Sequence, residues 1–83
     1  MNVVILTPEK EVFKGSATSV KVPGIGGAFE VLRNHAPVVS GLENGTVRVL
    51  AEGGKRLLFH INSGFVEVLN NEVSILAQGL TAE

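Results

Sequence analysis

Apolar and polar residues alternate along most of this chain, so that every second residue shares a side. Runs of this kind occupy residues 16–22, 46–51, 56–61, 65–69 and 73–77. A repeat of two residues is typical of a β-strand with one buried face, whereas an amphipathic helix repeats every 3.6 residues, and no segment sustains the helical repeat. The pattern turns the following residues toward a core: Val20, Val22, Val47, Val49, Ala51, Leu57, Phe59, Ile61, Val66, Val68, Val73, Ile75 and Ala77.

Glycine and asparagine separate these runs. Residues 53–54, 62–64 and 70–71 fall between them and supply the positive φ angles that tight hairpins need. About nine short strands result, which is too many for one open sheet in a chain of this length. We therefore expect a single all-β domain over residues 1–83, either a β-sandwich or a flattened barrel.

The side opposite the expected core is less polar than a free-standing sandwich requires. Within residues 16–22 it carries Ala17, Ser19 and Lys21, while Thr18 is on the core side. Scattered apolar residues on a surface are normal, and a strand can change sides at a bulge, so no partner is needed to explain them. Alternatively, one sheet face is a contact surface, because a contiguous exposed apolar area usually marks an interface. The large residues concerned are Val4, Leu6, Leu58, Phe65, Leu69 and Leu76.

Composition limits the possible functions. The chain has 83 residues, 45% of them hydrophobic, and a net charge of -1, so neither nucleic acid nor an anionic membrane attracts it electrostatically. It has no cysteine, which excludes disulfides and thiolate metal sites. The first apolar run follows Met1 without a basic segment and is much shorter than the roughly 18 residues of a membrane span. We expect a soluble domain whose link to any membrane is indirect.

Candidate catalytic groups are sparse. His35 and His60 have no cysteine companions, and His60 lies beside core positions in a strand, where we expect a histidine that binds no metal. The acidic residues have no spacing that would pair two carboxylates for acid–base catalysis. The segment PGIGGAF places Phe29 where a G-x-G-x-x-G motif has its third glycine, so we expect a flexible loop and no phosphate site. We predict no enzyme activity, no cofactor and no metal site.

Three segments together resemble one protein family over essentially the whole chain. TPEKEVFKG at residues 7–15, VKVPGIGGAFEVLRNHAPVVSGLENGTVRV at 20–49 and INSGFVEVLNNEVSILA at 61–77 are similar, in order and spacing, to the epsilon subunit of F-type ATP synthases. The resemblance implies an N-terminal β-sandwich of about ten antiparallel strands. It also implies a non-catalytic central-stalk (rotor) subunit that binds the gamma subunit and the c ring and couples proton movement to ATP synthesis or hydrolysis. Such a subunit lies peripherally on the cytoplasmic side of a bacterial membrane.

The resemblance also assigns docking residues. Pro37 fixes its own φ and favours extended geometry at Ala36, so we expect the peptide around Asn34 and His35 to be stiff before it binds a partner. Without the resemblance, Asn34 and His35 would more simply satisfy local backbone groups in a turn. Many family members carry an acidic residue at the place of Ala28, so the contact of this chain cannot depend on that charge. By alignment of motifs, the c-ring contact comprises Gly26, Gly27 and Ala28, and the gamma contact comprises Thr7, His35, Val39 and Ser40.

The end of the chain departs from the family. The family usually continues past ILAQGLTAE into a helical hairpin that regulates hydrolysis and in some members binds ATP. Either these 83 residues are a natural short form or the chain was truncated, and in both cases we expect no helical C-terminal domain and none of that regulation within them. A lipoyl- or biotinyl-type carrier domain is the alternative, because Lys55 follows a glycine turn, although Gly54 stands where such carriers have Asp or Met. An adhesion or ligand-binding sandwich ranks last, since aromatic residues make up only 5% of the chain.

Overall fold

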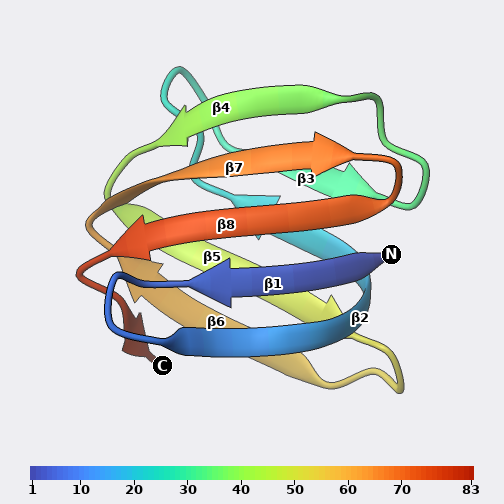
Figure 1. The fold of residues 1–83 in the computed structure, drawn as a ribbon, viewed down its shortest axis with the longest axis horizontal. Coiled ribbons are helices and arrows are strands. Elements are labelled where there is room, and N and C mark those ends of the chain that lie inside the picture. Colours follow the sequence, from blue (N-terminus) through green and yellow to red (C-terminus); the bar gives the residue numbers. More distant parts are fainter.

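Nine β-strands and no helix make up the structure, a computed structural model that describes residues 1–83. The all-β prediction is confirmed: there are nine strands, as the alternation predicted, where the family resemblance implied about ten. There is accordingly no helix that could cross a membrane. Figure 1 shows the strands arranged in two layers. They are β1 (Asn2–Leu6), β2 (Glu11–Val22), β3 (Phe29–Leu32), β4 (Val38–Leu42), β5 (Gly45–Ala51), β6 (Arg56–Ile61), β7 (Ser63–Leu69), β8 (Glu72–Gln78) and β9 (Thr81–Ala82).

One long strand, β2, belongs to both layers. Residues 11–16 of β2 pair with β1, and residues 17–22 pair with β5 and β3. The first layer therefore has the order β4-β7-β8-β1-β2, and the second has the order β3-β2-β5-β6-β9. The path of paired strands ends at β4 and β9 and does not close, so the molecule is a sandwich and not a barrel.

One strand pair departs from the antiparallel expectation. β1 runs parallel to β8, with Val3 opposite Val73 and Ile5 opposite Ile75, whereas all the other pairs are antiparallel. β1 and β8 come from opposite ends of the chain, so no hairpin turn dictates their relative direction. Their buried side chains nevertheless share one face. The N-terminal strand is thus an interior strand of the first layer, between β8 and β2 (Figure 1).

The predicted division of residues 16–22 into a core side and a solvent side is wrong for residues 17–19. Ala17 and Ser19 are buried and Thr18 is exposed, although Val20 is buried as expected. The register between β2 and β5 shifts between Ala17 and Ser19, so that two successive residues, Ser19 and Val20, face inward. A bulge of this kind changes which side of a strand faces the core. It lies where β2 passes from the first layer to the second.

The core is a cluster of sixteen buried apolar residues contributed by both layers. Eleven of them were predicted from the alternation, and two other predicted core residues, Ala51 and Leu57, are only half-buried. Ala51 adjoins the β5–β6 turn, and Leu57 packs against the core cluster but remains partly exposed. The remaining five core residues had not been predicted to be in the core, and one of them, Ala17, had been placed on the opposite side: Val3, Ile5, Ala17, Val31 and Leu42.

Candidate functional site

The outer face of the first layer carries most of the large exposed apolar side chains. Phe65 on β7 is 62% exposed and Val39 on β4 is 72% exposed. Four of the six outward residues expected from the alternation are exposed, whereas Val4 and Leu58 are half-buried. We call the following residues the apolar face: Leu6, Ile25, Val39, Phe65, Leu69 and Leu76.

Strand register aligns three of these residues into a band. Phe65 lies between Gly41 on β4 and Leu76 on β8, and Leu76 lies beside Leu6 on β1. Side chains that oppose one another on neighbouring strands are close enough to touch. Phe65, Leu76 and Leu6 therefore form a continuous apolar band three strands wide. In the next row, apolar and polar residues are mixed: Val39, Glu67, Ser74 and Val4.

Ile25 extends this band past the edge strand β4. Its backbone N–H donates to the Gly41 carbonyl at 2.9 Å, which fastens the loop between β2 and β3 to β4. A Cβ atom at Gly41 would lie 2.9 Å from Ile25 Cδ1, so a glycine at position 41 lets the Ile25 side chain lie close against the strand. These two residues, with Phe65 and Leu76, border a groove of about 560 Å³. The groove continues the apolar band toward the loop.

The three residues assigned to the c-ring contact occupy the tip of that loop. At its base, Gly24 pairs with Leu42, and the Gly27 N–H donates to the Gly24 carbonyl at 2.9 Å. Gly26 and Gly27 have φ angles of 94° and 143°, and a Cβ atom would meet nothing within 4 Å at either position. Ala28 completes the exposed tip. The loop therefore has a base fixed by hydrogen bonds and a tip with very little side-chain bulk.

His35 lies half-buried in the connection between β3 and β4. Its backbone N–H donates to the Leu32 carbonyl at 3.1 Å, and its ring centroid lies 6.4 Å from that of Phe29. The ring Nδ1 lies 2.7 Å from the Ala36 carbonyl oxygen, which can only accept, so Nδ1 carries the proton. In the neutral ring Nε2 is then an acceptor, and no hydrogen bond within the domain engages it.

Asn34 ties the same connection to the turn of the β7–β8 hairpin. Its backbone N–H donates to Asn71 Oδ1 at 2.7 Å, and Asn71 Nδ2 donates to Asn34 Oδ1 at 3.0 Å. Both residues have left-handed backbones, with φ angles of 63° and 62°. The Asn34 side chain thus bonds to a different element and not to its own turn. Pro37 follows in the exposed part of the connection.

The four residues assigned to the gamma contact do not form one cluster. Val39 belongs to the apolar face, and its neighbour Ser40 is half-buried with its Oγ donating to the Gly41 carbonyl at 3.0 Å. Thr7 lies in the connection from β1 to β2, where its Oγ1 bonds to the backbone of its own turn. Figure 1 shows that connection at the opposite end of the sandwich from the β3–β4 connection, which holds His35. The structure therefore groups His35 with β4 and separates Thr7 from it.

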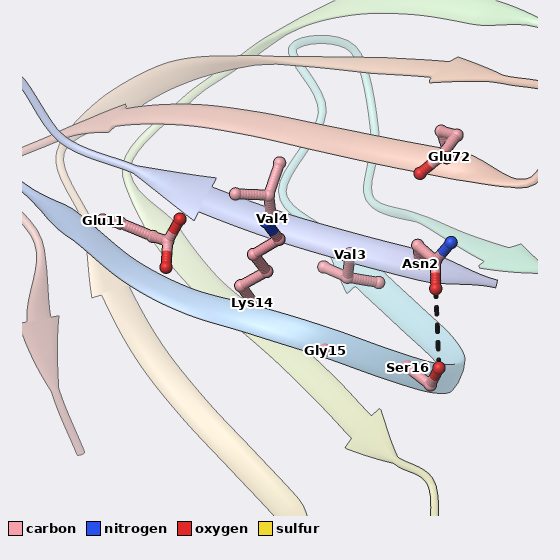
Figure 2. Close-up of a pocket in the computed structure, with 8 residues that line it drawn as sticks. All are labelled: Asn2, Val3, Val4, Glu11, Lys14, Gly15, Ser16 and Glu72. Carbon is pink, nitrogen blue, oxygen red and sulfur yellow. Dashed lines mark hydrogen bonds between the residues drawn. The ribbon is translucent and has the colours of Figure 1, made fainter.

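The outer face of the first layer becomes polar toward β2. Figure 2 shows Glu11 and Lys14 on β2, Asn2 on β1 and Glu72 on β8 around a depression of about 480 Å³. Ser16 Oγ donates to Asn2 Oδ1 at 3.5 Å, at the far end of this depression. The apolar face thus has a charged and polar border on one side, which is the usual arrangement of a protein contact surface.

Comparison with known proteins identifies the family. The family model described as "ATP synthase, Delta/Epsilon chain, beta-sandwich domain" matches residues 1–83. This chain belongs to that family. Among its epsilon-chain relatives, the ATP synthase epsilon chain of Chlorobium limicola is 36% identical, over 93% of this chain and 88% of the relative. The epsilon chain of Chromohalobacter salexigens is 40% identical, over 93% of this chain and 55% of the relative, so the chain spans about half the length of that longer protein.

Two solved mitochondrial ATP synthase structures contain chains whose fold closely resembles that of this delta/epsilon-family domain. A chain of the Euglena gracilis mitochondrial ATP synthase, in a structure of OSCP, F1 and the c ring, has a TM-score of 0.85 at 23% identity and covers 96% of this chain and 51% of its own. A chain in the central stalk and c ring of the Tetrahymena thermophila enzyme has a TM-score of 0.80 at 20% identity, covering 98% of this chain and 65% of its own. These similarities support the two-layer fold.

The carrier-domain alternative is not supported. Lys55 is exposed directly after Gly54 in the turn of the β5–β6 hairpin, but the family that matches the whole chain is the ATP synthase delta/epsilon family. Elsewhere in this epsilon-family domain, no three residues among His, Cys, Asp and Glu gather where they could hold a metal. His60 Nε2 lies 3.2 Å from Asn44 Oδ1. The candidate site of this epsilon-family domain is therefore the apolar face, whose exposed side chains suit contact with another apolar surface.

Sequence patterns did not identify two residues of the candidate site in this epsilon-family domain, Ile25 on the apolar face and Asn71 beside the β3–β4 connection. Ile25 is a single large aliphatic residue among the glycines of PGIGGAF, which is a signal for an exposed apolar contact that alternation does not detect. Asn71 was assigned only to a turn. Its partner Asn34 is 37 residues away, and no local pattern connects the two.

Proposed function

We propose that this domain is a non-catalytic central-stalk subunit of a proton-translocating ATP synthase, where it joins the gamma subunit to the c ring. The observation that carries the proposal is the apolar band of Phe65, Leu76 and Leu6, exposed in a chain that belongs to the ATP synthase delta/epsilon family. A small sandwich that exposes such a band buries it in a larger assembly, because each square ångström of apolar surface removed from water contributes roughly 25 cal/mol.

In this proposal the gamma subunit covers the apolar face. Val39 lies within the face, and the Nε2 acceptor of His35 lies at the end of the layer where β4 begins, so it can accept a hydrogen bond from a partner. Thr7 lies at the other end of the layer, so it belongs to the same contact only if gamma extends along the whole length of β4 and β1. The charged border near β2 then fixes the orientation of gamma, since rim charges favour one register over others.

The loop tip of Gly26, Gly27 and Ala28 is proposed to contact the c ring. A tip with almost no side chains allows the two backbones to approach closely, and its fixed base keeps the loop from losing much conformational freedom on binding. Ala28 supplies no charge, so this contact depends on shape and backbone groups. The same argument makes the contact sensitive to any long side chain introduced at the tip.

The proposed role is mechanical coupling and includes no chemistry. The domain transmits rotation between proton flow and nucleotide chemistry that other subunits perform, and it binds no cofactor or nucleic acid. Support for the mechanical role comes from the exposed band of apolar side chains in a chain of the ATP synthase delta/epsilon family. We place the subunit peripherally on the cytoplasmic side of a bacterial cell membrane, as part of ATP synthase, and it reaches that membrane only through its partners.

Affinity purification of the tagged subunit from its native membranes tests the proposal. We expect the gamma and c subunits to be retained together, and we expect the subunit on its own to show neither ATP hydrolysis nor saturable micromolar ATP binding in calorimetry. Retention of neither subunit would refute the central-stalk role. ATP binding by the 83-residue chain alone would reveal a site that this assignment lacks.

A further inference from the structure

The hydrogen bonds that join the connection between β3 and β4, residues 33–37, to an element beyond β3 all come from a single pair of residues. We call the two reciprocal hydrogen bonds between Asn34 and Asn71 the amide clasp; they measure 2.7 Å and 3.0 Å. The other hydrogen bonds of residues 33–37 stay within the connection or reach the adjoining end of β3, as those of His35 to Leu32 and Ala36 do. The clasp is therefore the hydrogen-bonded link between the connection and the β7–β8 hairpin of the first layer.

Asn71 is suited to this task by its own backbone. It is the second residue of the tight β7–β8 turn, and Asn70 and Asn71 both have positive φ angles, 51° and 62°. Two successive left-handed residues make a turn whose twist matches the strands, so the position of the Asn71 side chain is fixed by the hairpin. The Asn71 carbonyl also accepts the Asn2 N–H at 3.0 Å, which secures the turn to β1. Asn71 is thus anchored from both sides before it binds Asn34.

We propose that Asn71 is a positioning residue for partner docking: through Asn34 it holds His35 and the start of β4 in the geometry that the gamma subunit binds. The inference rests on the proposed function, because it concerns the same contact. Asn71 itself need not touch gamma. If the connection is ordered in advance, binding does not have to restrict it, and affinity rises by the amount of ordering that is avoided.

Glycine substitutions separate the clasp from the turn. Asn71→Gly removes both clasp hydrogen bonds, yet it keeps the Asn71 carbonyl and tolerates a positive φ. Asn70→Gly is the matched control, since Asn70 has the same kind of backbone in the same turn and makes no side-chain hydrogen bond. Asn34→Gly opens the clasp from its other end at a residue that also has positive φ.

Two measurements on the full subunit decide the matter. Hydrogen exchange should show the Asn34 amide exchanging at least about 10-fold faster in Asn71→Gly than in Asn70→Gly, because only the former loses its acceptor. Binding to F1 depleted of this subunit should weaken roughly 3- to 10-fold in Asn71→Gly and stay unchanged in Asn70→Gly. The double variant Asn34→Gly/Asn71→Gly should bind no more weakly than Asn71→Gly, as expected when both residues act through one contact.

The proposal is overturned if Asn71→Gly binds depleted F1 as tightly as Asn70→Gly does, or if its Asn34 amide remains as protected as in the unsubstituted subunit. It is also overturned if both glycine variants weaken binding equally, since the turn and not the clasp would then be responsible. If the unsubstituted subunit fails to bind depleted F1, the proposed function fails and the docking role of Asn71 fails with it. The exchange comparison would then still show whether the clasp orders the connection.

Discussion

Gly64 shows how closely the backbones of β7 and β8 approach each other. It lies opposite Ala77, and a Cβ atom at Gly64 would collide with the carbonyl oxygen of Leu76. A backbone atom cannot rotate away as a side chain can, so we expect Gly64→Ala to destabilise the fold by roughly 2 kcal/mol or more. In a domain of this size that change lowers the melting temperature by roughly 8–16 °C, which thermal unfolding followed by circular dichroism would measure.

Gly15→Ala is the control for this prediction. The nearest atom to a Cβ at Gly15 is a ring carbon of Phe13 at 3.3 Å, and that ring can shift slightly. Its melting temperature should therefore fall much less than that of Gly64→Ala. Equal losses in the two variants would mean that the close approach of β7 and β8 does not limit the residue at position 64.

Ala28 and Val20 separate docking from folding at the scale of single residues. Ala28→Arg places a long charged side chain at the proposed c-ring contact and should weaken assembly by roughly 1–3 kcal/mol, while the free energy of unfolding changes by about 0.5 kcal/mol or less. Val20→Ala empties part of the core and should lower the free energy of unfolding by about 2 kcal/mol, affecting assembly only through that loss. Thermal unfolding and retention in the purified complex are measured side by side. Normal assembly of Ala28→Arg would remove this loop from the ring contact.

At the scale of elements, we expect replacement of an exposed leucine by glutamate to weaken partner binding in the first layer but not in the second. Leu76 on β8 and Leu32 on β3 are 51% and 52% exposed, and only Leu76 lies on the apolar face. Leu76→Glu should weaken binding to the gamma-containing complex by roughly 2–4 kcal/mol, because it buries an unpaired carboxylate in the contact. Leu32→Glu should leave binding nearly unchanged, and both variants should remain folded. If the two variants bind equally well, the apolar face is not the docking surface.

Most strands could be predicted from the sequence, because alternation of apolar and polar residues is a local pattern that does not depend on which strand lies next to it. The side change at Ser19 could not, since the bulge depends on where β2 leaves β1 and joins β5. Exposure of Phe65 and Leu76 followed from alternation alone. Their alignment in one band did not, because register across strands is a long-range property. The link from Asn34 to Asn71 was hidden for the same reason.

At the scale of the whole molecule, sharing β2 should make the two layers unfold together. If β2 unfolds, β1 loses a paired strand in the first layer, and β3 and β5 lose one in the second. Neither layer can therefore keep all its strand pairs without β2. We expect the slowest amides of both layers, such as those of Val49 and Val73, to exchange with one common free energy of roughly 4–12 kcal/mol. Native-state hydrogen exchange measures this. A difference of several kcal/mol between the layers would show that they open independently.

The passage of β2 through both layers also determines how the domain carries a mechanical load. A sideways force between two layers held only by side-chain packing is resisted by many weak dispersion contacts, each worth about 0.1–0.2 kcal/mol. Here the same force also stretches the covalent backbone of Glu11–Val22, whose end leads directly into the loop at Pro23. If the apolar face and the loop tip contact partners as proposed, a force between the two contacts therefore runs along the backbone of β2 as well as through the hydrogen bonds that join the loop to β4, and both paths resist stretching.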